Sequence, residues 1–502
     1  MKIRWTRLSV VVFWLAMTGW LIRYEAFPGA FTNSVAGYRS LFKEGILGRD
    51  TWMKILFQNA PIGYSHSRID IDEASPDRYC TVVDRTVLNL HIMGESQKVT
   101  SSVVAVLRSN YQLAQFTFSL VSGMYSMRIK GERAAGDLYD VAVETGAQKQ
   151  RIRVRIPDDA VLYSPMTEMS LKRLKPGDKM NVKAFDPTSQ SVADVRITAL
   201  REESFKSGGG EVLATVLSID FKGMEVLAWM DRDGTMLRQE TPFGWTLVAC
   251  PPDEALAADR ASGGPSDLLA AMAVPTRGEV DDPRHCRALR VRLSGAPFAD
   301  FHLARDRQTV ESSGEREVVL RLTSADEPGP APAHRDEGLD AFLAPTLYIQ
   351  SDHPRMVRQA QRIVGTETNP LARATAIYEW VYRNVAKNPT VSVPSALDVL
   401  QRLEGDCNEH TYLFVGLARA AGLPAKVVVG LTYARGAFYY HAWPAVYAGR
   451  WIEMDPTLGQ PAVDATHIAL LEGELKDQLK LMQIFGRLKA EILPEGTPGA
   501  KP

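Results

Sequence analysis

Hydrophobic and polar residues alternate along the first half of this chain. From Thr51 to about residue 231, short alternating stretches are separated by glycines and by Asp-Gly turns such as Asp233-Gly234. Alternation with a period of two is typical of strands that bury one face. Because many such stretches follow one another without long helices between them, the pattern predicts an antiparallel, curved sheet or open barrel.

The second half of the chain changes to helical spacing. Asn369 followed by Pro370 is typical of a helix start. The apolar residues after them predict one buried helix face, made of Ala374, Ile377, Tyr378, Val381 and Val385. Farther on, Asp406 and Glu409 form an Asp variant of the capping box, which predicts a helix over residues 407–421.

An apolar run without charges, residues 8–22, follows Lys2, Arg4 and Arg7. Cations ahead of an apolar run are typical of a membrane anchor or of a cleaved signal peptide. As a helix the run would reach about 22 Å, short of a ~30 Å hydrocarbon core unless its flanks extend it. We favour an uncleaved, single-pass anchor in the cell membrane, because no small-x-small cleavage site directly follows the run. The body of the chain is then expected on the periplasmic or extracytoplasmic side.

The overall charge excludes one class of partner. Lysines and arginines number 58 and acidic residues 59, so no basic excess is available to bind nucleic acid. The four cysteines are too few for a disulfide scaffold, although Cys80, Cys250 and Cys286 leave room for one structural pair. Cys407 stands apart, and we expect it to be a free thiol.

Cys407 carries the first sign of chemistry. The capping box places it in the first turn of the helix over residues 407–421. Free backbone N–H groups and the positive end of the helix dipole stabilise a thiolate at this position, so we expect the pKa of the Cys407 thiol to fall. A thiolate in polar company, beside Gly405 and Asn408, suits a nucleophile better than an inert core thiol.

A β-hairpin is expected shortly after this helix. Its strands are residues 438–446 and 450–455, and residues 447–449 form a three-residue loop. Three-residue hairpin loops commonly end in a left-handed residue, and Gly449 adopts that conformation without strain. This choice of loop determines which residues of the two strands lie opposite each other.

The predicted register brings a histidine and an aspartate together. Pairing Val446 with Arg450 places His441 directly opposite Asp455, with Cβ atoms about 4.5–5.5 Å apart on one face. A carboxylate at that distance can accept a hydrogen bond from an imidazole N–H. A thiol at a helix start, with a histidine oriented by an aspartate, is an arrangement for nucleophilic attack on a carbonyl.

These residues and their flanks resemble a known family. The stretches SALDVLQRLEGDCNEHTYLFVGLARAAGLPAKVVVGL and YYHAWPAVYAGRWIEMDPTLGQPAVDATHI are similar to the bacterial transglutaminase-like domain of the papain-like superfamily, over roughly residues 352–470. The resemblance implies that Cys407 is the nucleophile, His441 the base and then the acid, and Asp455 the residue that orients His441. The family includes transglutaminases, peptidases and amidases, so the implied substrate is a protein or peptide amide.

Two other residues near the predicted triad have alternative interpretations. His410 lies one helical turn after Cys407, as a rival base or as half of a Cys-x-x-His metal site, but no further soft ligand lies nearby. Trp443 is a candidate substrate-binding residue, or it packs across the strands against Glu453 and Trp451. No calcium-loop motif is present, so we expect no metal and no cofactor.

Together these patterns predict an α+β protein with an N-terminal membrane anchor, an antiparallel β-rich domain and a C-terminal papain-like transglutaminase core. The predicted function is an envelope-facing thiol enzyme that acts on amide or peptide bonds by acyl transfer or hydrolysis. The alternative is a non-catalytic, membrane-anchored binding or scaffold module that uses the β-rich domain. Apolar spacing in the tail, from Ile468 to Ile492, predicts an amphipathic helix.

The expected segments are 1–25 (signal anchor or signal peptide), 26–50 (connector), 51–252 (β-rich domain), 253–336 (small β segment and Pro-rich linker), 337–475 (transglutaminase-like domain) and 476–502 (C-terminal helix and tail).

Overall fold

The structure is a computed structural model, and its described residues leave out the two ends of the chain. It describes residues 33–34, 38, 49–162, 174–325 and 338–494, with short gaps at 93, 124, 147, 208–209, 243, 261–266 and 394. The predicted anchor at residues 8–22 and most of the Pro-rich linker lie outside this part. Within it, no helix has the length and apolarity that a bilayer-crossing helix requires.

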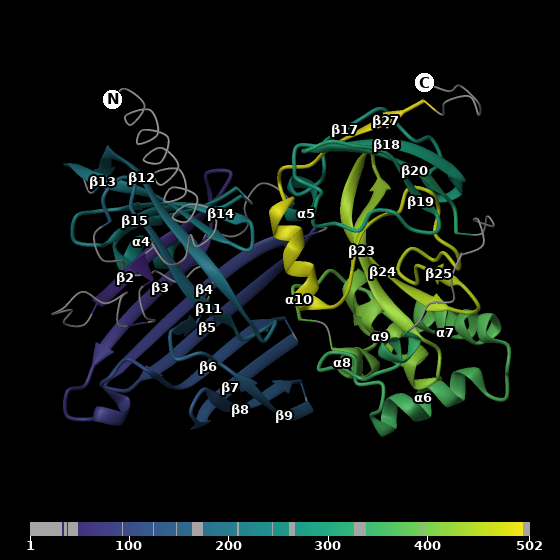
Figure 1. The fold of residues 1–502 in the computed structure, drawn as a ribbon, viewed down its shortest axis with the longest axis horizontal. Helices are drawn as coiled ribbons and strands as arrows, with labels where there is room; N and C mark the ends of the chain where they lie inside the picture. Colours follow the sequence, from purple (N-terminus) through teal and green to yellow (C-terminus); the bar gives the residue numbers. More distant parts are fainter. Residues whose placement is uncertain are drawn as a thin grey trace, which may run out of the picture.

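One large sheet, almost entirely antiparallel, occupies the N-terminal half (Figure 1). Its central strands run in the order β11-β12-β13-β14-β15-β16-β2-β3-β4-β5-β6-β7-β8-β9, and β1 and β10 pair with β11 in parallel. Neighbouring strands in the sheet are neighbours in sequence except where β16 meets β2 and where β1 meets β11. The strands are β1 (Asn33–Ser34), β2 (Arg49–Phe57), β3 (Ala60–Ile71), β4 (Cys80–Ile92), β5 (Glu95–Leu107), β6 (Leu113–Ser122), β7 (Tyr125–Ala135), β8 (Leu138–Thr145), β9 (Gln148–Arg155), β10 (Ala160–Leu162), β11 (Lys179–Asp186), β12 (Ser191–Ser207), β13 (Gly210–Phe221), β14 (Met224–Met230), β15 (Met236–Glu240) and β16 (Trp245–Ala249).

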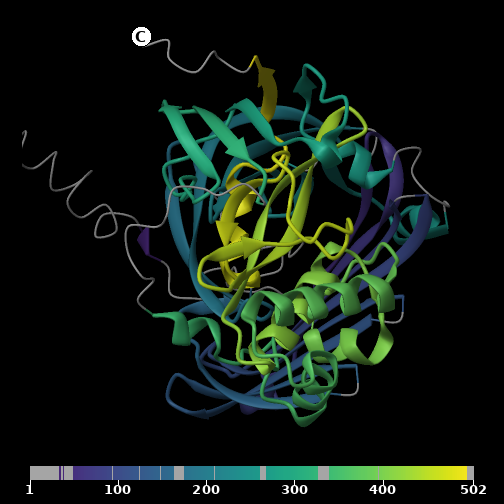
Figure 2. The same cartoon turned by 90° about the vertical axis from the view of Figure 1, so that its right-hand side faces the viewer.

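The alternation in the sequence explains these strands. In β7, for example, Met127 and Ile129 are buried whereas Arg128 and Lys130 are exposed. The Asp233-Gly234 turn is also found between β14 and β15, with Gly234 at a φ of 79°. The prediction of an antiparallel β-rich domain is confirmed, and Figure 2 shows its strands curving behind the C-terminal part of the chain.

A five-stranded sheet joins the middle of the chain to its end. Its order is β17-β27-β18-β20-β19, so β27, the last strand among the described residues, lies between two strands from residues 276–294. The strands are β17 (Thr276–Arg277), β18 (Ala288–Ser294), β19 (Gln308–Ser313), β20 (Glu317–Thr323) and β27 (Lys489–Leu493). Helices α4 (Pro252–Arg260) and α5 (Leu268–Ala271) precede this sheet.

The amphipathic helix predicted from Ile468 to Ile492 is wrong. This segment forms β26 (Ile468–Glu472), a short turn of helix α10 (Leu475–Gln478), the 3-10 helix η5 (Leu479–Gln483) and then β27. Gly473 and Gly486 have φ values of 128° and 70°, which interrupt a helix. The apolar residues are buried by pairing with β23 and β18, because those two sheets offer open edges.

The C-terminal part combines a four-stranded sheet with four helices (Figure 2). The sheet order is β25-β24-β23-β26, with β23 (Ala425–Ala434), β24 (Ala437–Tyr447) and β25 (Trp451–Glu453). The helices are α6 (Pro354–Val364), α7 (Pro370–Asn384), α8 (Ala396–Arg402) and α9 (Cys407–Ala420). Every residue of α9 from Glu409 to Arg419 is buried, so this helix is the centre of the packing.

Two local predictions for this part are confirmed. The Asn369 side chain caps α7 by accepting hydrogen bonds from the N–H groups of Leu371 and Ala372, and Pro370 occupies the first turn. The predicted apolar face of α7, from Ala374 to Val385, is buried. The observed α9 ends one residue before the predicted helix.

The β-rich domain contacts the region that precedes Cys407. The hydroxyl of Tyr125 in β7 donates a 2.6 Å hydrogen bond to the carbonyl of Glu404, and the guanidinium of Arg402 lies over the Tyr125 ring. On another side, the Tyr348 hydroxyl donates to the carbonyl of Thr188. The large sheet therefore holds the segment that leads into the first turn of α9.

Candidate active site

Cys407 lies at the first position of α9, as the capping box predicts. The Asp406 carboxylate accepts a 2.9 Å hydrogen bond from the N–H of Asn408, and the Glu409 carboxylate accepts one of 2.9 Å from the N–H of Asp406. This reciprocal pair satisfies two N–H groups at the helix start and holds the backbone around the cysteine. Cys407 is half-buried and is a free thiol.

The expected fall in the thiol pKa is wrong. Burial raises the pKa of the Cys407 thiol well above its ordinary value, and the neighbouring Asp406 carboxylate adds to the rise. A hydrogen bond from the backbone N–H of Ala442 acts in the opposite direction but is outweighed. The effect of the helix dipole falls off within one turn and is small beside the cost of burying a thiolate.

The hairpin that carries His441 has a different register from the predicted one. Val446 pairs with Ile452 and Tyr447 with Trp451, so the loop is residues 448–450 and the pairing is displaced by two residues. Gly449 has the expected positive φ, 87°, but in the middle of the loop. A displacement of two residues keeps every side chain on its predicted face, because faces alternate with a period of two.

His441 and Asp455 meet despite the changed register. The strand β25 ends at Glu453, and the chain then turns so that the Oδ2 atom of Asp455 lies 2.7 Å from the Nε2 atom of His441. The other carboxylate oxygen of Asp455 accepts hydrogen bonds of 2.8 and 2.9 Å from the N–H groups of Thr457 and Leu458. Asp455 has no exposed surface and His441 keeps 8%.

The short β25 strand brings β24 into contact with the cysteine. Backbone groups of alternate residues point to the same side of a strand. The Pro444 carbonyl accepts a 3.0 Å bond from Met454, so the N–H of Ala442 points to the same side, beyond the end of β25. There it donates to the Cys407 sulfur. The residue next to His441 is thus in direct contact with the thiol.

Residues 357–456, which contain Cys407, His441 and Asp455, match the family model of the transglutaminase-like superfamily. This segment is a transglutaminase-like domain. A match to this superfamily indicates a cysteine-dependent enzyme.

Three known proteins are similar to parts of the chain. An uncharacterized protein of Haemophilus influenzae is 29% identical over 139 residues, which are 25% of this chain and 37% of the relative, so the chain spans little more than a third of that protein. A proposed cysteine protease from Cytophaga hutchinsonii is 18% identical, with a TM-score of 0.29 over 41% of this chain and 81% of that one. The periplasmic domain of TgpA from Pseudomonas aeruginosa bound to ethylmercury is 18% identical, with a TM-score of 0.27 over 37% and 75%.

A second histidine supports the aspartate of the transglutaminase-like domain. The Nε2 atom of His467 lies 3.1 Å from the same Oδ2 atom of Asp455, and its Nδ1 atom lies 3.2 Å from Asp464. Asp464 in turn accepts a 2.7 Å bond from Gln460 and lies 3.1 Å from the guanidinium of Arg284. His467 has no exposed surface. His467 and Asp464 therefore extend the His441–Asp455 pair into a buried hydrogen-bond network.

The charges of this network alternate. Burial alone lowers the pKa of His467, but its hydrogen bonds to Asp455 and Asp464 outweigh burial and raise that pKa. Burial likewise opposes ionisation of Asp455, yet His441 and His467 hold the pKa of this carboxyl well below its usual range. The pKa of Asp464 falls to about 2 because His467, Thr466 and Arg284 outweigh its burial. A protonated His467 between two carboxylates fits these directions.

The sequence assigned no role to His467. It is part of the stretch that resembles the family, but its contact with Asp455 requires β26 to pair with β23. The tail was expected to be helical, and a helix would not have placed His467 beside Asp455. The only signal in the sequence is the three-residue spacing between Asp464 and His467.

The prediction that Trp443 is a substrate-binding residue is wrong. Trp443 has no exposed surface, and its indole N–H donates a 2.6 Å hydrogen bond to Glu453. Its ring lies 6.0 Å from the His441 ring at an interplanar angle of 23° and meets His467 edge to face at 5.1 Å. Trp443 is therefore packing that supports both histidines, as the alternative interpretation proposed in part.

His410 is buried inside the helix packing and does not reach the His441–Asp455 pair. Its Nδ1 atom lies 2.7 Å from the Asp406 carbonyl, and burial lowers its pKa. The ring is thus a neutral donor that supports the start of α9.

Three residues in the described part of the chain could hold a metal ion. The donor atoms of His441, Asp455 and His467 lie within 4.8 Å of one another, and all three residues are buried. A metal would need the Nε2 lone pairs of both histidines. The raised pKa of His467 favours a ring that keeps its protons between two carboxylates, so the group fits a hydrogen-bond network better than a metal centre.

Replacing His467 with glutamine should destabilise the protein most at low pH. A raised pKa contributes stability that is fully present below the unfolded value of about 6.5 and is lost as pH rises through the folded value. We expect a loss of about 3–5 kcal/mol at pH 6, because two buried carboxylates lose a charged partner, and a smaller loss at pH 9. Urea unfolding at both pH values measures this. The exposed His285→Gln variant should change stability by less than about 0.5 kcal/mol, and an equal loss for His467→Gln at both pH values would contradict a protonated His467.

The raised pKa of Cys407 predicts slow alkylation at neutral pH. Iodoacetamide reacts with the thiolate, so labelling of the Cys407 peptide, followed by mass spectrometry, should become fast only above the usual cysteine pKa of about 8.5. Replacing Asp406 with asparagine keeps a capping side chain and removes the repelling charge, so labelling should shift to lower pH. At a fixed pH below the pKa, the thiolate fraction rises about tenfold for each unit by which the thiol pKa falls. Fast labelling of the wild type at pH 7 would show that the pKa of the Cys407 thiol is not raised.

Proposed function

We propose that this protein is a thiol enzyme that acts on amide or peptide bonds through Cys407, His441 and Asp455. The observation that carries the proposal is the 2.7 Å contact between His441 and Asp455, together with the hydrogen bond from the N–H of Ala442, the residue after His441, to the Cys407 sulfur. A helix-start thiol with a histidine that an aspartate orients is an arrangement that supports acyl transfer.

In the proposed reaction the Cys407 sulfur attacks the carbonyl carbon of an amide. His441 takes the thiol proton as the C–S bond forms and donates it to the nitrogen as the C–N bond breaks. An amine, or ammonia from a carboxamide, leaves and a thioester remains on the sulfur. Water or a second amine then attacks the thioester carbon, the C–S bond breaks, and the proton returns to the sulfur.

The protonation states support this order of events. Because the pKa of the Cys407 thiol is raised, the resting sulfur carries its proton and needs a base at the moment of attack. The Nε2 atom of His441 is occupied by Asp455, which leaves Nδ1 as the nitrogen that exchanges the proton. His467 acts as a positioning residue, since it keeps the Asp455 carboxylate ionised and oriented.

The start of α9 offers a donor for the negative charge that develops on the substrate oxygen. The capping box uses the N–H groups of Asp406 and Asn408. We propose the N–H of Cys407, which lies between them, as the oxyanion donor. A preorganised backbone N–H in a partly buried site stabilises such a charge more than water does.

Trapping the acyl-enzyme tests this function. The full-length chain is incubated with peptides that contain glutamine, quenched in acid, and examined for an adduct on Cys407 by mass spectrometry. We expect an adduct in the wild type, none on Cys407→Ser, and formation slowed by about 10²–10⁴ in Asp455→Asn, because the histidine loses its orienting charge. Added glycine ethyl ester should discharge the adduct as an amide if the reaction is transfer.

The matched controls use residues of the same kind outside the site. Cys286→Ser removes another half-buried thiol, and Asp352→Asn removes an exposed carboxylate at the start of α6. Both should form the adduct at the wild-type rate. Adduct formation on Cys407 that does not depend on His441 or Asp455, or no adduct from any peptide or from envelope extract, would favour the scaffold alternative.

We further propose that the substrate is a protein or peptide of the cell envelope, reached from a membrane anchor. The support lies in the sequence, where Lys2, Arg4 and Arg7 precede the apolar run at residues 8–22. The full-length chain should sediment with membranes and be digested by protease added to spheroplasts. A chain recovered with the cytoplasmic proteins would contradict this location.

A further inference from the structure

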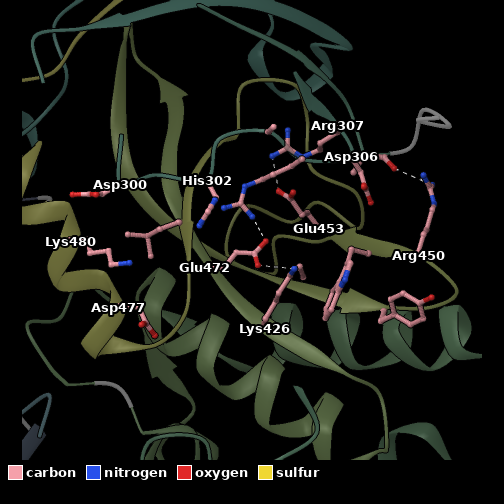
Figure 3. Close-up of a pocket in the computed structure, with 17 residues that line it drawn as sticks. Asp300, His302, Asp306, Arg307, Lys426, Arg450, Glu453, Glu472, Asp477 and Lys480 are labelled. Atoms are coloured by element: carbon pink, nitrogen blue, oxygen red, sulfur yellow. Dashed lines mark hydrogen bonds and ion pairs between the residues drawn. The ribbon is translucent and has the colours of Figure 1, made fainter. Parts of the chain in front are cut away.

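A polar pocket of about 480 Å³ lies outside the triad of the transglutaminase-like domain (Figure 3). It is formed by the loop of residues 300–307, the β24–β25 hairpin, the neighbouring strands β23 and β26, and the segment of α10 and η5. Cys407 and His441 do not line it. Its volume is within the range of about 300–1,000 Å³ that is typical of small-molecule sites.

The centre of the pocket is a cluster of ion pairs with one excess positive charge. Arg307 lies 2.7 Å from Glu453, Lys426 lies 2.8 Å from Glu472, and Arg305 also pairs with Glu472. Three cations thus share two carboxylates. Figure 3 shows the interactions of Arg307, Lys426, Glu453 and Glu472 in the middle of the pocket. We call the five residues of these ion pairs the central cluster: Arg305, Arg307, Lys426, Glu453 and Glu472.

The central cluster also has hydrogen-bond donors without partners. Within the described residues, the Nε and Nη1 atoms of Arg307 and the Nε atom of Arg305 have no acceptor, although all three atoms are buried. Only 8% of Arg307 is exposed. A buried guanidinium N–H without a partner destabilises the folded chain, and a carboxylate is the acceptor that suits it best.

The opposite charge gathers at the side of the pocket next to α10. Asp300, Asp477 and Lys480 line that side, two carboxylates against one cation (Figure 3). On the other side, Arg450 and Asp306 carry one charge of each sign. The pocket is therefore positive at its centre and negative towards α10, with equal numbers of cationic and acidic side chains overall.

We propose that this pocket binds a small zwitterion, a free amino acid or a short peptide, with its carboxylate at the central cluster and its ammonium group towards Asp300 and Asp477. A zwitterion matches both ends and leaves the lining neutral, whereas an anion or a cation alone adds net charge to a half-buried site. The side chain or the peptide body lies beside Trp451 and Tyr447, two aromatic residues of the lining.

The occupied pocket would touch the support of the triad. The Nη2 atom of Arg307 donates to the carbonyl of His467 at 2.5 Å as well as to Glu453. Glu453 accepts the indole N–H of Trp443, whose ring packs on His441. The central cluster is thus hydrogen-bonded directly to His467 and Trp443, which pack around Asp455 and His441. A carboxylate bound at the cluster would share the Arg307 guanidinium that donates to His467 and Glu453.

Isothermal titration calorimetry with three matched probes tests this site. The probes are triglycine, N-acetyltriglycine (carboxylate only) and triglycinamide (ammonium only), each titrated to about 10 mM into the full-length Cys407→Ser chain. We expect triglycine to bind at least about tenfold more tightly than either blocked form, because each of those loses one ion pair. Since the protein used lacks the nucleophile, the outcome is independent of the proposed catalytic function.

Two variants and a control locate the binding. Arg305→Gln should weaken triglycine and N-acetyltriglycine by about tenfold, whereas Asp477→Asn should weaken triglycine and leave N-acetyltriglycine unchanged. Arg358→Gln, at an exposed position on α6, should bind like the parent. If Arg305→Gln does not fold, Asp477→Asn still decides. No binding of triglycine, equal binding of all three probes, or binding that neither variant changes would overturn the proposal.

Discussion

The buried carboxylate of Asp455 is the group on which the candidate site depends. A charge with no exposed surface costs several kcal/mol unless hydrogen bonds replace its hydration. Asp455 meets this requirement with two backbone N–H groups on one oxygen and two imidazoles on the other. Each of these partners is oriented by the carboxylate in return, so the orientation of His441 follows from the solvation of Asp455.

The partners of Asp455 come from different parts of the chain, and the sheets bring them together. His441 lies on β24, whereas His467 immediately precedes β26, which pairs with the far side of β23. At Gly430 of β23 a Cβ atom would lie 1.9 Å from the carbonyl of Ile468, so only glycine allows β26 this close approach. The large sheet contributes from outside, through the contact of Tyr125 with Glu404.

The chemistry of the thiol follows from a competition between two local effects. The first turn of α9 favours a thiolate through its N–H groups, as does the N–H of Ala442. Burial and the Asp406 carboxylate favour the protonated form and prevail. The capping residue that builds the helix start therefore also opposes ionisation of the cysteine beside it.

The sequence by itself determined the elements whose causes are local. Alternation predicted the antiparallel sheet, the Asn369–Pro370 pair and the capping box predicted the starts of α7 and α9, and the period of two placed His441 and Asp455 on one face. The predicted register was displaced by two residues, but the face survived because a displacement of two preserves it.

Only the tertiary structure decided what depends on distant partners. The tail became β26 and β27 because two sheets offered open edges, and this pairing brought His467 to Asp455. The burial of Trp443 and the raised pKa of Cys407 likewise depend on how much protein surrounds each side chain. Spacing along a chain reports which face a residue occupies, whereas burial and electrostatics are sums over neighbours that the folded chain brings from elsewhere.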